Sequence, residues 1–386
     1  METLLYSEIN ILCITMLVVI ATKAEKVGID KRFKNTLFTS SVWFATAANF
    51  FDFLWNLCNS ELLKMPIPIM MMLNSLYFVS FGLSGLLWLL YSETPPGESW
   101  DKNRRVMFLE VLPLLALIAL LAISVPTGCL YYFDENGVYH RGSLFYTQQV
   151  LSYGYFFIAS INTLNMAMQE NNYAFRDDLL SNAGFIIPPV ICIVFQYLFR
   201  GLPILSVGIV VSYFQVYLSG LHSQIALDTL TGISNRRQLL VHLANVIKMH
   251  GNEEKIYFCF LDIDKFKQIN DIYGHNEGDN ALIAVSAALK KVCAESGGFC
   301  ARYGGDEFAV VQQLKTDESI SDIMAKIQSA VEGRINASGL DYKVKISTGC
   351  AQYADGESIA ELIQRADKDM YIQKTHGGIE LQNTEN

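Results

Sequence analysis

Two acidic stretches contain residue types that could hold a metal ion and move a phosphoryl group. Asp262 and Asp264 end a run, residues 255–261, that is nearly all apolar or aromatic and predicts a strand buried on both faces. Asp306 and Glu307 form the second stretch. Mg²⁺ binds one or two carboxylates and fills its other positions with water and substrate phosphate. If the two stretches lie on adjacent strands, Asp262 and Asp306 can share a metal pair that activates a hydroxyl and neutralises charge on a transferred phosphoryl group.

A turn and a polar run complete this candidate site. Gly304 and Gly305 precede the second acidic pair, where they allow positive φ and leave room for a ligand to approach the backbone. Residues 265–279 supply lysines for phosphate groups and amide or carboxylate groups for the edge of a base. Each feature alone is typical of an ordinary surface hairpin or strand end. The three together, in this order, indicate nucleotide chemistry.

The segments around these residues alternate between helical and strand patterns, which predicts an α/β sandwich with helices flanking one sheet. The expected helices cover about residues 236–248, 279–294, 318–332 and 358–373. The expected strands cover about residues 255–261, 298–302, 307–312 and 342–353, with the second and third forming a hairpin.

The first 220 residues have a different character. Only 17% of the 386 residues are charged, below the roughly 25% of ordinary soluble chains. The first 220 residues hold just 12 Lys/Arg and 15 Asp/Glu. A transmembrane helix needs about 20 mostly apolar residues. Seven stretches are expected to span a membrane: residues 4–22, 37–57, 69–91, 106–125, 148–168, 184–199 and 202–220.

The basic residues between these stretches predict an orientation. The odd-numbered loops hold nine Lys/Arg and the even-numbered loops hold three. Lys and Arg are enriched in cytoplasmic loops, so the N-terminus is expected outside and the C-terminal domain inside.

Two features of this region could take part in sensing. The largest outward segment, residues 126–147, contains Asn136-Gly137 between aromatic residues, which predicts a hairpin turn. It is either a connector folded over the bundle mouth or part of a ligand-sensing surface. Asp52 lies within an expected span, where a charge is costly, and should face the bundle interior. Whether Asp52 contacts a ligand is left open at this point.

Net charge and cysteine usage exclude some classes of protein. The net charge of −9 gives no basic footprint for nucleic acid. The eight cysteines show no CxxC and no metal-binding spacing. Cys259, Cys293, Cys300 and Cys350 fall in the C-terminal domain and are expected to be reduced thiols in its core.

Three motifs of the C-terminal part resemble those of the GGDEF family. They are Asp228-x-Leu230-Thr231-Gly232-x-x-Asn235-Arg236-Arg237, the run 262–279, and Gly304-Gly305-Asp306-Glu307-Phe308, and the resemblance extends from about Leu227 to Gly377. Members of this family are diguanylate cyclases, which condense two GTP into cyclic di-GMP with release of pyrophosphate. The apolar stretches predict an α-helical multi-pass membrane bundle. The resemblance implies that an α/β palm-like domain follows it, with a central, mainly antiparallel sheet flanked by helices.

The resemblance also implies the metal ligands and the catalytic residues. Asp262, the backbone carbonyl of Ile263, Asp306 and Glu307 would bind two Mg²⁺ ions, with Mn²⁺ as an alternative. Asp306 would also lie near the attacking ribose 3′-hydroxyl and assist its deprotonation. Lys267 would act with Asp306 and Glu307 by holding phosphate.

The remaining family roles concern the nucleotide. Lys374 would hold phosphates, while Phe266, Gly304 and Gly305 would lie against the substrate. Asn270 and Asp279 would read guanine, with His275 close to the nucleotide. Guanine presents N1–H and a 2-amino group that one carboxylate can accept, whereas adenine presents a bare acceptor, so Asp279 favours GTP over ATP.

The resemblance divides the chain and names its partners. The expected parts are a seven-span sensory or anchoring region (1–220), a short helical linker (221–227), a cytoplasmic GGDEF domain (228–378) and a tail (379–386). GTP, a second copy of the chain and an unknown signal are the expected partners, in a cell membrane. Where the family often has an arginine, Gly378 stands instead. The alternatives are a catalytically silent domain that binds GTP or cyclic di-GMP, and a cyclase with another nucleotide product.

Overall fold

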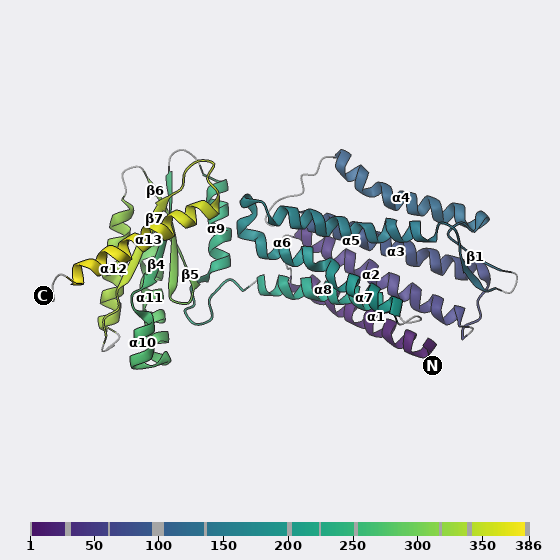
Figure 1. Ribbon diagram of the computed structural model, residues 1–386, viewed down its shortest axis with the longest axis horizontal. Helices are drawn as coiled ribbons and strands as arrows, with labels where there is room; N and C mark the ends of the chain where they lie inside the picture. Colours follow the sequence, from purple (N-terminus) through teal and green to yellow (C-terminus); the bar gives the residue numbers. More distant parts are fainter. Residues whose placement is uncertain are drawn as a thin grey trace. The chain divides into compact units, whose positions relative to one another are not determined.

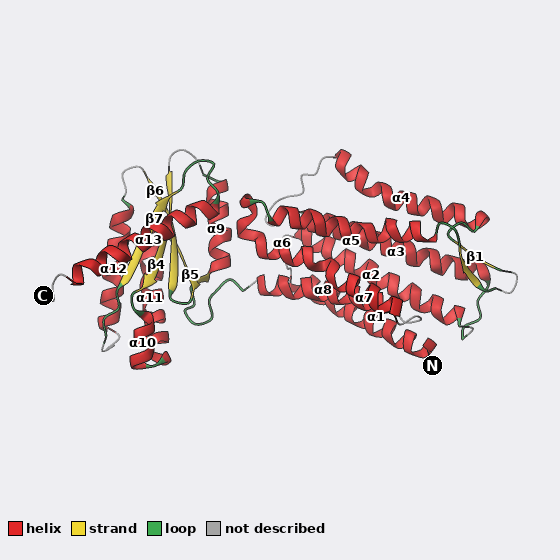
Figure 2. Cartoon of the chain, viewed as in Figure 1, coloured by secondary structure: helices red, strands yellow, loops and turns green. Residues whose placement is uncertain are grey.

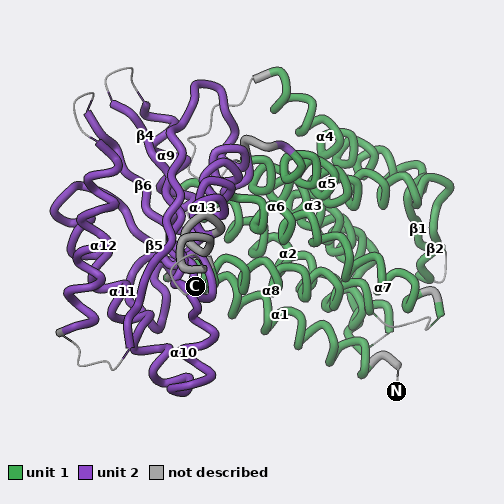
Figure 3. Tube along the Cα trace, turned by 60° about the vertical axis from the view of Figure 1, so that its left-hand side comes forward, with its two compact units in different colours: residues 1–168, 175–224 green, residues 169–174, 225–386 purple. Residues whose placement is uncertain are grey.

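The chain divides into two compact units. A computed structural model describes residues 2–27, 32–60, 62–94, 104–134, 137–198, 203–223, 225–250, 254–315, 319–337 and 342–382. Unit 1 contains Met1–Met168 and Phe175–Gln224, and unit 2 contains Gln169–Ala174 and Ile225–Asn386 (Figure 3, green and purple).

Unit 1 is a helical bundle with one small hairpin (Figure 1). Its helices and strands, with the short η1 that joins α5 to α6, are α1 (Glu2–Val27), α2 (Arg32–Asn59), α3 (Ile67–Glu93), α4 (Arg104–Thr127), β1 (Tyr131–Phe133), β2 (Tyr139–Arg141), α5 (Phe145–Ala167), η1 (Glu170–Phe175), α6 (Arg176–Ala183), η2 (Gly184–Ile186), α7 (Ile187–Leu198) and α8 (Ile204–Ser223). Large aromatic side chains fill its centre, where Trp88 stacks on Phe185 with ring centroids 4.0 Å apart.

Five helical stretches of the described residues, not seven, are long and apolar enough to cross a membrane. They are Leu4–Lys26, Ile67–Glu93, Arg105–Thr127, Asn172–Gln196 and Ile204–His222. The expectation for residues 37–57 and 148–168 was wrong by this measure, although both lie in long helices, α2 and α5. Both helices place polar side chains, such as Ser41 and Gln148, inside the bundle, and these lower their apolar character.

The segment expected to form a hairpin, residues 126–147, does form one in its described part. β1 and β2 pair antiparallel, with Tyr131 opposite Arg141. Gly137 has a φ of 77° and its N–H donates to the carbonyl oxygen of Asp134, as a tight turn requires. Asn136, the other residue of the expected turn, lies outside the described residues.

Unit 2 is built around one five-stranded sheet (Figure 2, yellow arrows). The strand order is β3-β5-β6-β4-β7, and only the β3–β5 pair is parallel. The mainly antiparallel sheet predicted from the sequence is therefore confirmed. The elements are β3 (Ser234–Asn235), α9 (Arg236–Lys248), β4 (Glu254–Ile263), α10 (Phe266–Tyr273), α11 (His275–Ser296), β5 (Phe299–Gly304), β6 (Glu307–Lys315), α12 (Ile320–Ala337), β7 (Ile346–Gln352) and α13 (Ile359–Gln382).

Strand alternation decides which way the functional acids point. Leu261 and Ile263 of β4 pack into the core under α11 and α12, together with Phe308 of β6. Successive side chains of a strand point to opposite faces, so Phe260 and Asp262 face the other side. Two helices cover that side. α9 contacts β5 and β6, and α13 contacts β4 and β7.

The linker differs from the expected helix. α8 ends at Ser223, Gln224 lies outside the described residues, and residues 225–227 are not helical. Asn235 explains this, because its backbone N–H donates to Ala226 O at 3.0 Å and its side-chain amide donates to Ile225 O at 2.6 Å. These bonds draw the chain into the edge of unit 2, so the continuous helix expected through Leu227 is wrong.

The cysteines of unit 2 also depart from expectation. Cys259 of β4 and Cys350 of β7 lie directly opposite each other, with Cα atoms 4.1 Å apart, and form a disulfide. Cys293 and Cys300 are free thiols, as expected. The expectation missed the pair because strand register, which the sequence alone does not give, brings these two side chains together.

Gly349, in the middle of β7, lies directly against α13. A Cβ atom there would lie 2.0 Å from the backbone nitrogen of Met370 and 2.4 Å from the carbonyl oxygen of Ala366, both on α13. Only glycine lets α13 lie this close to the sheet. This contact fixes the position of α13 against the sheet.

We therefore expect Gly349→Ala to lower the free energy of unfolding by at least about 1–3 kcal/mol, the usual cost of overpacking. Gly333→Ala is the matched control, since Gly333 is exposed within α12 and a Cβ atom added there would meet no other atom within 4 Å. That substitution should stabilise the helix by roughly 0.5–1 kcal/mol. Thermal melting of the full chain in detergent measures both changes. Equal melting temperatures for the two variants would contradict this account of α13 packing.

Candidate nucleotide and metal site

The structure brings the two acidic stretches together. β4 and β6 are neighbours in the sheet, and Asp262 lies opposite Glu307 in their register. Asp306 is in the turn before β6, and its carbonyl oxygen accepts a hydrogen bond from the N–H of Ile263 at 3.3 Å. Asp262, Ile263, Asp306 and Glu307 thus share one edge of the sheet.

One cation already lies at this edge. The Nζ atom of Lys374, from α13, bonds the Oδ1 atom of Asp262 at 2.6 Å. The Asp262 side chain is 12% exposed and that of Lys374 is 44% exposed. Burial raises the pKa of Asp262, the bond from Lys374 opposes that rise, and nearby Asp306 and Asp264 add to it. Burial also raises the pKa of Glu307, helped by the charges of Asp262 and Asp306.

This donor set suits a hard divalent cation. Carboxylates that lie close together repel each other unless a positive charge lies beside them. At Asp262 the Lys374 ammonium supplies that charge. Among the described residues, no three acidic, His or Cys side chains converge closely enough to hold a metal unaided. Mg²⁺ does not require that, since it is commonly bound by one or two carboxylates with water and substrate phosphates.

The glycine turn is braced from a distant motif. Gly305 has a φ of 52°, as expected for a tip glycine, and its carbonyl oxygen accepts from two nitrogens of Arg302 at 2.9 and 2.8 Å. Arg302 in turn pairs with Asp228 at 3.1 Å. Burial opposes ionisation of Asp228, but hydrogen bonds from Thr231 and Arg302 outweigh it and lower its pKa. The motif around Asp228 therefore supports the turn that carries Asp306.

The chain turns sharply after the metal edge. Lys265 is the one non-glycine with positive φ among the described residues, at 56°. Its carbonyl oxygen accepts from the N–H of Gln268 at 2.8 Å, which starts α10 immediately after the strand. Lys267, on the first turn of α10, is exposed and free to reach a phosphate. A strained residue held at this position is typical of a functional loop.

The residues assigned to the base lie together on α10 and α11. Asn270 and Phe266 of α10 pack against Gly278 of α11, where a Cβ atom would lie 2.0 Å from Asn270 Oδ1 and 3.3 Å from Phe266 Cζ. Asp279 follows Gly278 directly, and His275 is one turn earlier on α11. Asp279 and His275 are exposed. Gly278 was not singled out from the sequence, because only the helix packing shows why a side chain is excluded there.

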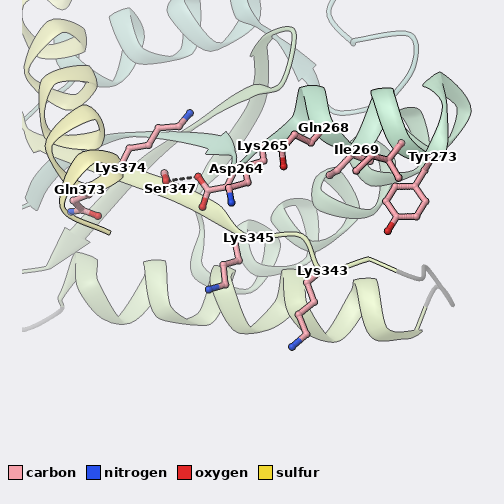
Figure 4. A pocket seen from close by; sticks show the side chains of 11 residues that line it. Asp264, Lys265, Gln268, Ile269, Tyr273, Lys343, Lys345, Ser347, Gln373 and Lys374 are labelled. Atoms are coloured by element: carbon pink, nitrogen blue, oxygen red, sulfur yellow. Dashed lines mark hydrogen bonds between the residues drawn. The ribbon is translucent and has the colours of Figure 1, made fainter. Parts of the chain in front are cut away.

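A cavity of about 600 Å³ lies beside the acidic edge (Figure 4). Asp264, which follows β4, accepts a hydrogen bond from the hydroxyl of Ser347 in β7 at 2.6 Å (Figure 4, dashed line). Four lysines, Lys265, Lys343, Lys345 and Lys374, line the same cavity, which makes its lining rich in positive charge (Figure 4). Lys374 therefore belongs both to this cavity and to the acidic edge. Asp264 had no predicted role beyond its place in the motif, because its partner Ser347 is on a distant strand.

A second brace holds the residue before the glycines. The guanidinium of Arg236 lies 4.6 Å from the ring centroid of Tyr303 and donates to the hydroxyl of Tyr173 at 3.2 Å. Tyr173 belongs to the segment Gln169–Ala174 of unit 2. This contact was not predictable, because Tyr173 is far from the motif in sequence.

The parts of this site indicate a class of enzyme. A mainly antiparallel sheet presents carboxylates from two adjacent strands at one edge, beside lysines and a polar helix pair suited to a nucleotide. Such a domain has the parts of a metal-dependent nucleotidyltransferase.

Comparison with known proteins gives the family. Residues 225–379 match the family model described as "Diguanylate cyclase, GGDEF domain". This part of the chain is a GGDEF domain, as the sequence motifs predicted.

Similar proteins share this part. Diguanylate cyclase DgcP of Escherichia coli K12 is 35% identical over 153 residues, which cover 39% of this chain and 44% of that protein. Diguanylate cyclase A of Treponema denticola is 35% identical over 141 residues, which cover 36% and 38%. The chain spans less than half the length of these relatives. This part of the chain also matches a crystal structure of the coiled coil and GGDEF domain of DgcB from Caulobacter crescentus, in complex with c-di-GMP. The match has 27% sequence identity, covers 43% of this chain and 90% of that chain, and has a TM-score of 0.35.

Because the pKa of Glu307 is raised, replacing this residue with a neutral one should stabilise the protein, by an amount that depends on pH. When folding raises the pKa of a carboxyl group, ionisation of that group destabilises the folded protein. This loss in the free energy of unfolding is absent below the usual pKa of 4.5 and complete above the raised pKa. We expect Glu307→Gln to raise the melting temperature at pH 8 without divalent cations. The gain should shrink as the pH falls toward 4.5.

Melting of the full chain across this pH range, with EDTA present, makes the measurement. Glu332→Gln, an exposed carboxyl on α12, is the control for simple charge removal. A Glu307→Gln gain that is equally large at pH 4 and pH 8 would contradict the electrostatic cause.

Proposed function

We propose that the chain is a membrane-bound diguanylate cyclase, which condenses two GTP into cyclic di-GMP with release of two pyrophosphates. The observation that carries this proposal is the shared edge of Asp262, Asp306 and Glu307, with Lys374 bonded to Asp262. The GGDEF family assignment and the relatives named diguanylate cyclase support it. The base-side residues, Asn270 and Asp279, are the reason to name GTP.

The metal-binding end follows from the acidic edge. Asp262, the carbonyl of Ile263, Asp306 and Glu307 would hold two Mg²⁺ ions, with Mn²⁺ as an alternative. When bound, these ions supply positive charge to the phosphates and to the attacking oxygen. Asp306 takes the proton from the ribose 3′-hydroxyl. Lys374 can then exchange its bond to Asp262 for a bond to phosphate, because its side chain is flexible and 44% exposed.

The chain's other residues bind and orient the substrate. Lys267 and Lys374 hold phosphates, and the exposed Gly304 and Gly305 leave room for them against the turn. The Asp279 carboxylate accepts hydrogen bonds from the guanine N1–H and 2-amino group, and the Asn270 amide bonds the same guanine edge. Phe266 and His275 lie beside the nucleotide. The 3′-oxygen attacks the α-phosphorus of the second GTP, a P–O bond forms there, and the bond to pyrophosphate breaks.

The stoichiometry requires two copies of the chain. One domain holds one GTP and the product needs two, so two domains must face each other across a two-fold axis. The apolar helices of unit 1 would place both copies in one membrane, which raises their effective concentration. If α2 and α5 also cross the membrane, the Lys/Arg bias of the loops between seven spans supports an external N-terminus and a cytoplasmic GGDEF domain. Unit 1 would regulate the encounter.

Product identification tests the proposal. The purified full chain is incubated with Mg²⁺ and GTP, and the products are weighed by mass spectrometry. Cyclic di-GMP and pyrophosphate in a ratio of one to two are expected. If GTP is left unchanged, the result supports a catalytically silent binding domain instead. A different cyclic product would reject the proposal that two GTP are condensed into cyclic di-GMP.

The acidic edge predicts strong effects of neutral isosteres. Asp262→Asn and Asp306→Asn should each lower kcat by roughly 10²-fold or more, since each removes a charge that stabilises the transition state. Asp271→Asn, an exposed carboxylate of α10 outside the edge, should leave the rate unchanged. Rates are compared for variants whose melting curves show them folded. Near-normal turnover by either edge variant would refute the metal assignment.

The packing of Asn270 predicts a substrate-binding variant. In Gly278→Ala the new methyl group would displace the Asn270 amide, which is the flexible end of a side chain, so the fold should survive. Losing the amide's hydrogen bond should raise KM for GTP by about tenfold, with a smaller effect on kcat. Steady-state kinetics of Gly278→Ala and the control Gly333→Ala test this. An unchanged KM in Gly278→Ala would show that Asn270 does not contact the nucleotide.

A further inference from the structure

A polar cluster inside unit 1 has no role in the cyclase chemistry. Asp52 of α2 accepts hydrogen bonds from the hydroxyl of Tyr6 at 2.9 Å and from the side-chain amide of Asn10 at 2.8 Å, both on α1. Both bonds end on Oδ2 of the carboxylate. Among the described residues, no Lys or Arg pairs with Asp52. The cluster therefore holds a carboxyl group with no cation beside it.

Aromatic side chains from two more helices surround this carboxylate. Tyr77 on α3 and Tyr153 on α5 lie within electrostatic range of each other and of Asp52. Phe81, also on α3, has its ring centroid 4.7 Å from that of Tyr153 and 6.4 Å from that of Tyr77. α2 packs on α1 and α3, and α3 packs on α5, so four helices meet here.

One buried atom of the cluster lacks a partner. Asn10 is fully buried and its Nδ2 donates to Asp52, but its Oδ1 has no hydrogen-bond partner. Leaving a buried acceptor unpaired costs about 1–3 kcal/mol. Asp52, Tyr6, Tyr77 and Tyr153 are all half-buried, so the cluster is not sealed. It has an unpaired acceptor, a carboxyl group and aromatic walls, and no donor of its own reaches Asn10 Oδ1.

The missing chemistry is that of a protonated amine. We propose that Asp52, Asn10 and the surrounding tyrosines form a binding site for a small primary ammonium ion. The ammonium pairs with Asp52, donates N–H to Oδ1 of Asp52 and to Oδ1 of Asn10, and packs its carbon chain against the rings of Tyr77 and Tyr153. Cations are attracted to aromatic faces as well as to carboxylates.

The neighbouring hairpin places the site near the segment that the sequence suggested for sensing. Trp55, one turn after Asp52 on α2, contacts Tyr139 of β2 edge to face at 5.2 Å. The hydroxyl of Tyr131 in β1 donates to the carbonyl oxygen of Met71 in α3 at 2.9 Å. The hairpin thus contacts the two helices that carry Asp52 and Tyr77.

Binding to the full chain in detergent tests the site without reference to cyclase activity. The probe is n-propylammonium chloride, and binding is followed by calorimetry and by the melting temperature. Tetramethylammonium chloride carries the charge without N–H, 1-propanol carries the chain without the charge, and sodium chloride matches ionic strength. We expect n-propylammonium to bind roughly tenfold or more tightly than each of these.

Two variants locate the binding. Asp52→Asn should weaken n-propylammonium binding by about tenfold or more. Glu8→Gln makes the same charge change at an exposed position of α1 and should leave binding unchanged. If Asp52→Asn does not fold, Tyr153→Leu, which keeps the carboxylate and removes one ring, should weaken binding by roughly twofold to fivefold.

Four results would overturn the proposal. They are no binding of n-propylammonium at millimolar concentration, equal binding by tetramethylammonium or 1-propanol, an equal melting shift with sodium chloride alone, and unchanged affinity in the folded Asp52→Asn variant or in Tyr153→Leu.

Discussion

Repulsion between carboxylates at one edge of a sheet is the constraint on which the GGDEF domain depends. Asp262, Asp306 and Glu307 are brought together by the pairing of β4 with β6, and burial makes the charges of Asp262 and Glu307 costly. Positive charge must therefore be supplied, and Lys374 supplies it at Asp262. Because Lys374 is on α13, the site requires α13 to lie close to the sheet. Gly349 permits that approach, so a residue with no chemistry of its own sets the position of a charged one.

The metal end and the base end of the site are built differently. At the metal end, a strand, a tight turn and the Asp228–Arg302 brace hold each acid in place, which suits groups that must position ions. At the base end, Asp279, His275 and Lys267 are exposed on two helices. Only the Asn270–Gly278 contact is tightly packed there. A rigid metal edge with an open nucleotide side suits an enzyme whose two substrates must meet from two separate domains.

Much of the site could be predicted from the sequence because its motifs are local. The bounds of α9 are those the pattern predicted, and the acids follow strands that their apolar runs identify. What failed depends on tertiary contacts. Strand register pairs Cys259 with Cys350, and bonds from Asn235 end the expected linker helix. α10 was not predicted, since it is only eight residues long, half of them polar, and directly follows the strained Lys265. In unit 1, inward-facing polar groups made α2 and α5 less apolar than a span requires.

The central claim is that the edge shared by Asp262, Asp306 and Glu307 binds divalent cations. Titration of Mn²⁺ into the full chain, followed by electron paramagnetic resonance of the free ion, tests it most directly when a non-reactive GTP analogue is present. We expect Mn²⁺ sites in the parent chain that are lost or strongly weakened in a double variant, Asp262→Asn with Asp306→Asn, whose melting curve shows it folded. Equal Mn²⁺ binding by the parent and the folded double variant would contradict the claim.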